Sequence, residues 1–96
     1  MAEYRLSPAA ERDLESIWIY TAQLWGAAQA QRYTAFLATT FEQLARSPQT
    51  APRCDHIRPG YRRARSKQHM VYFRETDFGI AIIRVLHHRM DSLRRL

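Results

Sequence analysis

The chain has 96 residues, 46% of them apolar and 25% charged, with a formal net charge of +6. This length fits a single domain over residues 1–96 with one two-layer core, and excludes a multidomain arrangement. One cysteine, Cys54, excludes an intrachain disulfide, and neither a signal peptide nor an apolar run of roughly 20 residues is visible. We therefore expect a soluble, cytoplasmic protein that does not contact the membrane.

The first fifty residues predict a short strand followed by two helices. Residues Glu3–Leu6 alternate between polar and apolar side chains, as a strand does. Ser7 can cap a helix that begins at Pro8, and Gly26 can end this helix in a left-handed conformation. A second helix follows at once and is closed by Ser47-Pro48. Because the link is so short, the two helices must fold back on each other as a hairpin.

Apolar residues recur at helical spacing along both predicted helices and define the side that we expect to be buried. The aromatic residues assigned to the core are Trp18, Trp25, Tyr33 and Phe41. Ile19 falls on the opposite side of its helix, among polar neighbours. A lone exposed Ile is common in soluble proteins, and contact with a partner protein is the alternative explanation.

The second half predicts a proline-rich loop and then a sheet. Residues 48–60 contain three prolines and a glycine and form the loop. Three strands are expected at 61–66, 69–74 and 80–86, joined by a turn at 67–68 and a hairpin loop at 75–79. The last strand is apolar on both faces, so we expect it to be central, with Arg84 paired or at the rim of a groove. The fold class is α+β, with an N-terminal strand, an α-helical hairpin and a three-stranded antiparallel sheet.

The sequence offers little support for metal or covalent chemistry. There is no glycine-rich phosphate loop and no zinc-type spacing, and Cys54-Asp55-His56 alone is a weak ligand set. No serine or cysteine stands in a recognisable nucleophile motif. We therefore expect neither a metal nor another cofactor.

Positive charge is concentrated in the second half of the chain. Residues 1–50 have a net charge of −1, whereas residues 51–96 have a net charge of +7. Such a half suits a polyanionic partner, either nucleic acid or an acidic protein segment, although a merely solvated surface is equally compatible with composition. The basic constellation is Arg62, Arg63, Arg65, Lys67, Arg74, Arg84, His87 and Arg89.

Six motifs between Tyr4 and Asp91 point to a known family, and the similarity covers essentially residues 3 to 96. They are Y-x-L-S-P-A-A-x-x-D-L from Tyr4, I-W-x-Y-T from Ile17, W-G at Trp25, I-R-P-G-Y-R from Ile57, H-x-V-Y-F-R from His69 and R-V-L-H-x-R-M-D from Arg84. With these motifs the chain resembles toxins of the RelE/ParE superfamily, and more closely those of the ParE branch. The resemblance implies the same order of strand, hairpin and sheet.

The resemblance also implies a function and two partners. It implies the toxin of a bacterial toxin–antitoxin pair, neutralised by a ParD-type antitoxin and inhibiting DNA gyrase by binding, without catalysis. RelE-type relatives instead cleave mRNA on the ribosome, and in that alternative the catalytic residues would be Arg62, Arg65, Arg84 and His87. No tyrosine follows Tyr72, so the terminal tyrosine of that nuclease type is absent, which favours the ParE branch.

Two sets of contact residues are expected for these partners. The set expected to bind the antitoxin is Ile19, Tyr20, Phe36, Arg62, Arg65 and Arg74. The set expected to bind the cellular target is Arg84, His87, His88, Arg89, Arg94 and Arg95. Direct binding of nucleic acid by the second set stays open.

Overall fold

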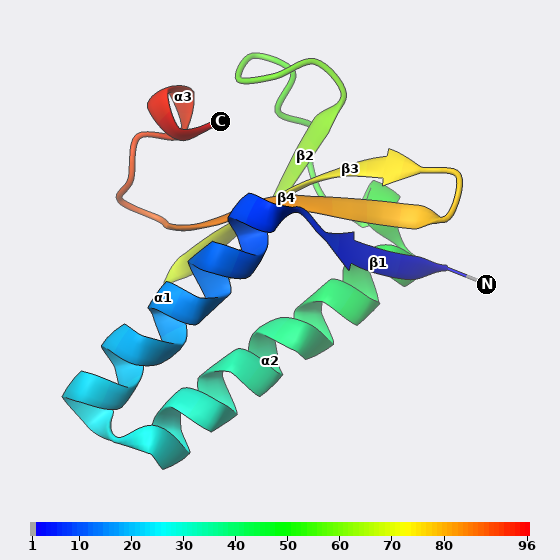
Figure 1. Ribbon diagram of the computed structural model, residues 1–96. Helices are drawn as coiled ribbons and strands as arrows, with labels where there is room; N and C mark the ends of the chain where they lie inside the picture. Colours follow the sequence, from blue (N-terminus) through cyan, green and yellow to red (C-terminus); the bar gives the residue numbers. More distant parts are fainter. Residues whose placement is uncertain (1) are drawn as a thin grey trace.

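A computed structural model describes residues 2–96 and places a helical hairpin against one face of a sheet (Figure 1). The elements are β1 (Glu3–Leu6), α1 (Pro8–Trp25), α2 (Ala27–Arg46), a short 3₁₀ helix η1 (Pro48–Thr50), β2 (Tyr61–Ser66), β3 (His69–Thr76), β4 (Gly79–His87) and α3 (Ser92–Arg95). The predicted strand, hairpin and sheet are therefore confirmed. No helix in the described part of the chain is long and apolar enough to cross a membrane.

The helical hairpin forms for the reasons its sequence suggests. The Ala10 N–H donates a hydrogen bond of 3.0 Å to the Ser7 side chain, which caps α1, and Pro8 occupies the first turn. Gly26 has φ of 92°, which ends α1 and starts α2 without an intervening loop. The two helices therefore fold back on each other at Gly26 and diverge toward the sheet (Figure 1).

The sheet is larger than predicted, because β1 belongs to it. The strand order is β1-β4-β3-β2, and β1 pairs with β4 in parallel, from Glu3 opposite Gly79 to Leu6 opposite Ile82. The expectation of a three-stranded antiparallel sheet is corrected to a four-stranded mixed one. Parallel neighbours cannot be joined by a tight turn, and the chain between β1 and β4 runs through the helical hairpin, β2 and β3.

The hairpin between β3 and β4 is tighter than the predicted loop at 75–79. Pairing continues to Thr76 opposite Gly79, so only Asp77 and Phe78 form the turn. Farther along, the register shifts between Tyr72 and Phe73, which leaves Ile83 unopposed as a bulge on β4. This irregularity changes which β4 side chains face the helices after residue 83.

Both faces of the sheet are covered, as the apolar character of β4 predicts. One cluster lies between the hairpin and the sheet and includes Leu37, Phe41, Phe73 and Ile82, each at most 1% exposed. A smaller cluster on the opposite face is formed by Cys54, Tyr72 and Leu86. There the loop after η1 and the α3 segment cover the sheet (Figure 1).

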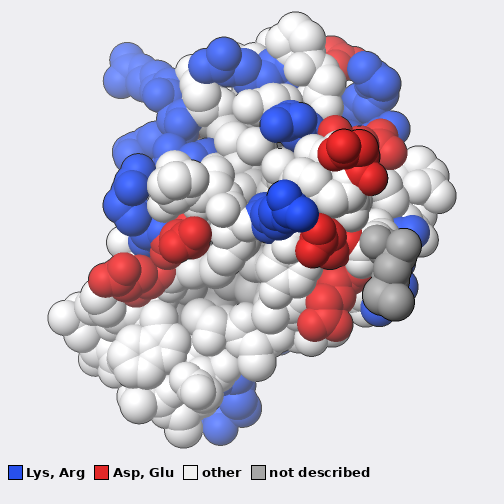
Figure 2. Space-filling view, turned by 45° about the vertical axis from the view of Figure 1, so that its right-hand side comes forward, with Lys and Arg blue, Asp and Glu red and all other residues white. Residues whose placement is uncertain are grey.

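The core prediction is wrong for Trp25. Phe41 is buried and Tyr33 packs against the core, but Trp25 is 73% exposed and Leu24 is 55% exposed. The reason is geometric, since the end of the hairpin projects past the sheet and has no layer opposite it (Figure 1). Figure 2 shows that this projecting end is mostly uncharged, whereas charged side chains crowd the part of the molecule around the sheet.

Candidate functional site

Arg84 is held by an acidic side chain of α1 and does not project freely. Its Nε and Nη2 donate to the two carboxylate oxygens of Asp13 at 2.7 and 2.8 Å, and its Nη1 donates to the Arg95 carbonyl at 2.8 Å. Asp13 also accepts the Val85 N–H at 2.9 Å. This carboxylate therefore provides a hydrogen-bond partner for the β4 backbone beyond the point where β1 ends. The bidentate contact with Asp13 raises the pKa of Arg84 above its ordinary value.

The second feature is a row of histidines where β3 and β4 meet the helices. His69 lies opposite His87 in the ladder, with ring centroids 5.6 Å apart, and His87 stacks on His88 at 4.6 Å. The Tyr33 hydroxyl of α2 lies 2.6 Å from His69 Nδ1 and accepts the Gln68 N–H at 3.2 Å. The phenol oxygen has lone pairs for both neighbours, and the tautomer of His69 sets which of Tyr33 and His69 donates in their contact.

Burial and neighbouring groups shift the pKa values of His69, His88 and Tyr33. Burial, followed by the neighbouring His87 and His88, lowers the pKa of His69 to about 4. Partial desolvation and then Arg65 lower the pKa of His88. Burial raises the pKa of the Tyr33 hydroxyl. At neutral pH His69 is therefore uncharged, and the Tyr33 phenol keeps its proton.

An apolar recess opens beside this row. It has a volume of ≈ 330 Å³ and is lined by Ser16, Ile17, Tyr20, Thr21, His69, His87 and Met90. An adjoining recess of ≈ 240 Å³ brings Arg84 and His87 together with Asp13. In a regular strand the side chains of Arg84 and His87 would point to opposite faces. The Arg84 guanidinium lines the same recess as His87 because it turns toward Asp13, at the edge of β4 beyond the end of β1.

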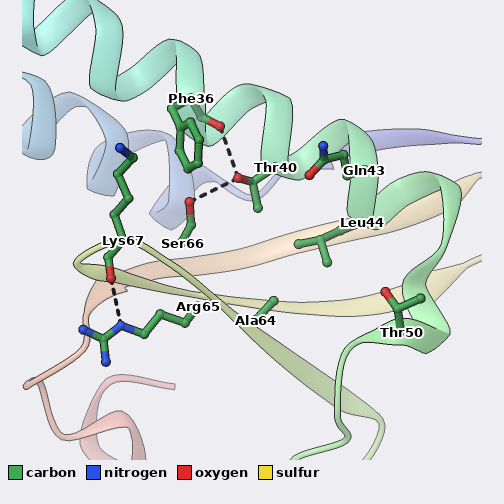
Figure 3. Close-up of a pocket in the computed structure, with 9 residues that line it drawn as sticks. All are labelled: Phe36, Thr40, Gln43, Leu44, Thr50, Ala64, Arg65, Ser66 and Lys67. Carbon is green, nitrogen blue, oxygen red and sulfur yellow. Dashed lines mark hydrogen bonds between the residues drawn. The ribbon is translucent and has the colours of Figure 1, made fainter.

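A separate groove runs between α2 and the edge strand β2 (Figure 3). It measures ≈ 350 Å³, and its walls are Phe36, Thr40, Gln43 and Leu44 of α2, Thr50 of η1, and Ala64, Arg65, Ser66 and Lys67 of β2 and its turn. The Thr40 and Ser66 hydroxyls lie 3.1 Å apart and tie the two walls together. The Lys67 ammonium lies 4.6 Å from the centre of the Phe36 ring, a cation–π contact at one end of the groove.

The residues expected to bind the antitoxin lie in three environments. Phe36 and Arg65 line the groove beside β2, whereas Tyr20 lines the histidine recess, and Ile19 lines neither of them. Arg74 is exposed on β3. Arg62 is engaged internally, since it donates to Glu75 at 3.2 Å and to the Ala51 carbonyl at 2.7 Å. The six residues thus do not form a single patch.

The residues expected to bind the target gather near the end of β4 and in the segment after it. His87 accepts the Arg89 N–H at 3.2 Å, and His88 Nε2 lies 3.1 Å from Gln68 Oε1. Arg89, Arg94 and Arg95 are exposed, and Arg94 forms only a loose pair of 3.7 Å with Asp91. These three guanidiniums are open to an anionic partner, whereas Arg84 is not.

Three residues with evident roles in these sites, Asp13, Tyr33 and His69, were not among the predicted site residues. Tyr33 was expected only in the core and His69 only at the start of a strand, whereas Lys67 was placed in the basic constellation without its contact with Phe36. Their contacts join positions 31 to 71 residues apart, which periodicity along the chain does not reveal. A possible signal was Asp13 itself, because a buried arginine in β4 requires a carboxylate partner.

No group of three or more His, Cys, Asp or Glu side chains in the described chain is arranged to hold a metal ion. The described residues instead form two adjoining recesses, a separate groove and an exposed set of guanidiniums. These features suit contact with another macromolecule that carries negative charge.

Comparison with known proteins identifies relatives of similar length. The family model of the ParE toxin of the type II toxin-antitoxin system, parDE, matches residues 4–92. Toxin ParE1 of Mycobacterium tuberculosis is 43% identical over 96 residues, covering 99% of this chain and 98% of the relative. Toxin ParE1 of Caulobacter vibrioides is 41% identical over 92 residues, covering 96% and 95%, and Toxin ParE of Escherichia coli is 35% identical over 97 residues, covering 100% and 94%.

A solved structure shares the fold. A chain of the chromosomal ParDE TA system from P. aeruginosa superimposes with a TM-score of 0.79 at 19% identity, covering 91% of this chain and 96% of that one. This likeness shows a shared fold, and the near full-length sequence matches show the family. The chain belongs to the ParE toxin family of type II toxin–antitoxin systems.

Proposed function

We propose that this toxin inhibits DNA gyrase by binding to it and that a ParD-type antitoxin neutralises it. The observation that supports inhibition by binding, without catalysis, is the set of hydrogen bonds that the Arg84 side chain makes within the chain. Three of the five N–H donors of its guanidinium are occupied, two by Asp13 and one by the Arg95 carbonyl, and the Asp13 carboxylate balances its charge, which argues against a role in stabilising a phosphate during cleavage. The family membership supplies the gyrase target as an inference.

The exposed guanidiniums near the end of the chain form the proposed contact with gyrase. Arg89, Arg94 and Arg95 are exposed, so neutralising them leaves the core intact. The antitoxin is proposed to carry a net negative charge, because residues 51–96 have a net charge of +7.

A supercoiling assay with purified gyrase tests this proposal. We expect the toxin to abolish supercoiling and to trap cleaved DNA, and we expect Arg89, Arg94 and Arg95→Gln together to weaken inhibition at least about tenfold. The matched control replaces the exposed helical arginines Arg12, Arg32 and Arg46 by Gln. Unimpaired supercoiling with a folded toxin that still binds its antitoxin would refute gyrase inhibition.

One arrangement supports the alternative, an mRNA endoribonuclease acting on the ribosome. Arg84 and His87 line the same recess, as a phosphate-binding group and a proton-transferring group would. His87→Gln separates the two functions. A nuclease should lose most cleavage of ribosome-bound mRNA with this change, whereas a gyrase inhibitor should lose little beyond affinity.

A further inference from the structure

A patch of polar and cationic side chains lies where the turn between β2 and β3 meets the segment after β4. It comprises Arg65, Gln68, His88 and Arg89, and we call it the turn patch. Two hydrogen bonds join its parts, since the His88 N–H donates to the Gln68 carbonyl at 2.9 Å and His88 Nε2 lies 3.1 Å from Gln68 Oε1. Figure 3 shows that the Arg65 side chain points away from α2. The patch is therefore separate from the groove between α2 and β2.

Several nitrogen atoms of the turn patch are open to an outside acceptor. Arg65 donates only through Nε, to the Lys67 carbonyl at 2.8 Å, so its two terminal nitrogens have no partner among residues 2–96. The Arg89 side chain is exposed and makes no hydrogen bond or ion pair within the described chain. His88 Nδ1 also lacks a partner in that part of the molecule. These groups contrast with Arg84, which is paired inside the protein.

Neighbouring groups keep His88 uncharged at neutral pH in the free protein. Partial desolvation, followed by Arg65, His87 and Arg89, lowers the pKa of His88, and no carboxylate contributes. An anion placed beside these cations would favour the imidazolium. In that state His88 Nε2 donates to Gln68 and Nδ1 donates to the anion. The patch therefore gains both a positive charge and a donor when an anion binds.

The other titratable groups around the patch supply no counter-charge to it. Asp13 of α1 is bound to Arg84 at 2.7 Å. His69 of β3 and the Tyr33 hydroxyl of α2 are uncharged at neutral pH. Asp91, in the segment after β4, takes part in the loose pair of 3.7 Å described above. An external anion is therefore the counter-charge that the turn patch lacks.

The composition of the patch favours nucleic acid over an acidic protein segment. Its side chains are two guanidiniums, an imidazole and an amide, with no apolar anchor among them. Interfaces between proteins are depleted of charged residues at their centre, whereas interfaces with DNA are more polar and much more positively charged. Phosphate oxygens of DNA accept hydrogen bonds from arginine and from amide side chains. The partner that fits best is therefore a DNA backbone.

We propose that the turn patch binds a phosphodiester group of the DNA that gyrase holds, with uptake of one proton by His88. This inference deepens the proposed inhibition of gyrase and rests on it for the source of the DNA. Arg65 and Arg89 donate to the phosphate oxygens, and the proton that His88 takes from solvent makes Nδ1 a further donor. Arg89 also belongs to the proposed gyrase contact, so the toxin binds DNA and protein side by side.

The test adds a fluorescein-labelled DNA duplex of about 20 base pairs to the full-length toxin and measures fluorescence anisotropy. A bound phosphate raises the pKa of His88, so binding takes up a proton and strengthens as the pH falls. We expect the affinity to rise about fivefold from pH 8 to pH 6. NMR of the imidazole rings should show the pKa of His88 rising by at least about half a unit when the duplex is added, with His56 unchanged.

A pair of double variants separates this patch from the general positive charge of the protein. Arg65→Gln with His88→Gln should weaken binding of the duplex at pH 6 at least about fivefold and remove most of the dependence on pH. The matched control is Arg32→Gln with His56→Gln, which removes one exposed arginine and one exposed histidine elsewhere. It has the same net charge and should keep both the affinity and its dependence on pH. Urea denaturation of both double variants checks that they are folded.

Three outcomes would overturn the proposal. The first is an unchanged pKa of His88 in the presence of the duplex. The second is an equal loss of affinity in the patch variant and in its matched control. The third is displacement of the duplex by a poly-glutamate peptide at equal concentration of charge, which would assign the patch to an acidic protein.

The supercoiling assay separates this inference from the proposed function. If the toxin inhibits gyrase and the variant with Arg65→Gln and His88→Gln inhibits it equally well, the patch is not used on gyrase-bound DNA, while gyrase inhibition stands. If the unmodified toxin fails to inhibit gyrase, the proposed function is wrong and so is the source of the DNA. Binding of the free duplex with proton uptake by His88 would then still support the patch as a site for DNA.

Discussion

The pair between Arg84 and Asp13 joins β4 to α1 and is mostly shielded from solvent. The side chains are 22% and 12% exposed. Asp13→Asn should reduce the free energy of unfolding by about 2–4 kcal/mol, because Arg84 keeps its charge without a counter-charge. Urea denaturation of this variant, of Arg84→Met and of the double variant gives the coupling energy. Additive effects of the two changes would contradict the pairing.

His69 is the residue whose protonation should limit stability in acid. Its pKa in the folded protein is about 4, against 6.5 for an ordinary histidine, so the unfolded chain binds more protons between these values. Stability is therefore full above pH 6.5 and falls as the pH drops towards 4, by about 1–2 kcal/mol once solvent screening of this half-buried ring is included. Urea midpoints from pH 4.5 to 7.5 should show this slope, and His69→Gln should flatten it. An NMR titration that returns an ordinary pKa for His69 would refute the explanation.

At the scale of elements, the attachment of β1 depends on Gly79. A Cβ at Gly79 would lie 2.0 Å from the Glu3 carbonyl oxygen, and Gly79 has φ of 142°. Gly79→Ala should cost about 3 kcal/mol or more and increase hydrogen exchange along β1. Gly26→Ala is the control, since Gly26 has positive φ but no atom within 4 Å of the added carbon, and it should cost about 1 kcal/mol. Equal costs for the two variants would show that backbone conformation, and not contact with β1, sets the effect.

The elements themselves could be predicted from local signals, whereas their pairing could not. Ser7, Pro8 and Gly26 mark the ends of α1 correctly, and alternation places Val71 and Phe73 on the helical face of β3. That β1 pairs with β4 has no local signature, because it joins residues 3–6 to residues 79–82. Trp25 was misplaced because helical periodicity shows which side of a helix is apolar, but not where the opposite layer ends.

The sequence predicted which types of residue line the recesses more successfully than it predicted which residues each of them contacts. The basic character of β2 and of the region after β4 is evident from composition, and Arg65, His87 and Phe36 do line recesses. Arg62 and Arg84 look equally suitable in the sequence, yet both donate to acidic side chains of the same chain. Which arginines remain available depends on tertiary pairing with Glu75 and Asp13.

For the whole molecule, the uneven charge should govern association with an acidic antitoxin. The affinity should fall by about tenfold between 50 and 500 mM salt, because exposed charges on residues 51–96 are screened. Isothermal titration across this range gives the slope. Neutralising Arg63, Arg65 and Lys67 should reduce it, whereas neutralising Arg12, Arg32 and Arg46 should not. Affinity that is independent of salt would exclude an electrostatic contribution.

The pairing of β1 with β4 also bears on how this chain is synthesised. While the ribosome makes residues 7–78, β1 has no partner, and the helical hairpin has only an incomplete sheet against which to bury its apolar side. Because β4 supplies the centre of that sheet, cooperative folding has to wait until residues 79–87 have left the exit tunnel. A nascent toxin should therefore stay unfolded and inactive through most of its own translation. That delay gives an antitoxin translated at the same time an interval in which to meet its partner.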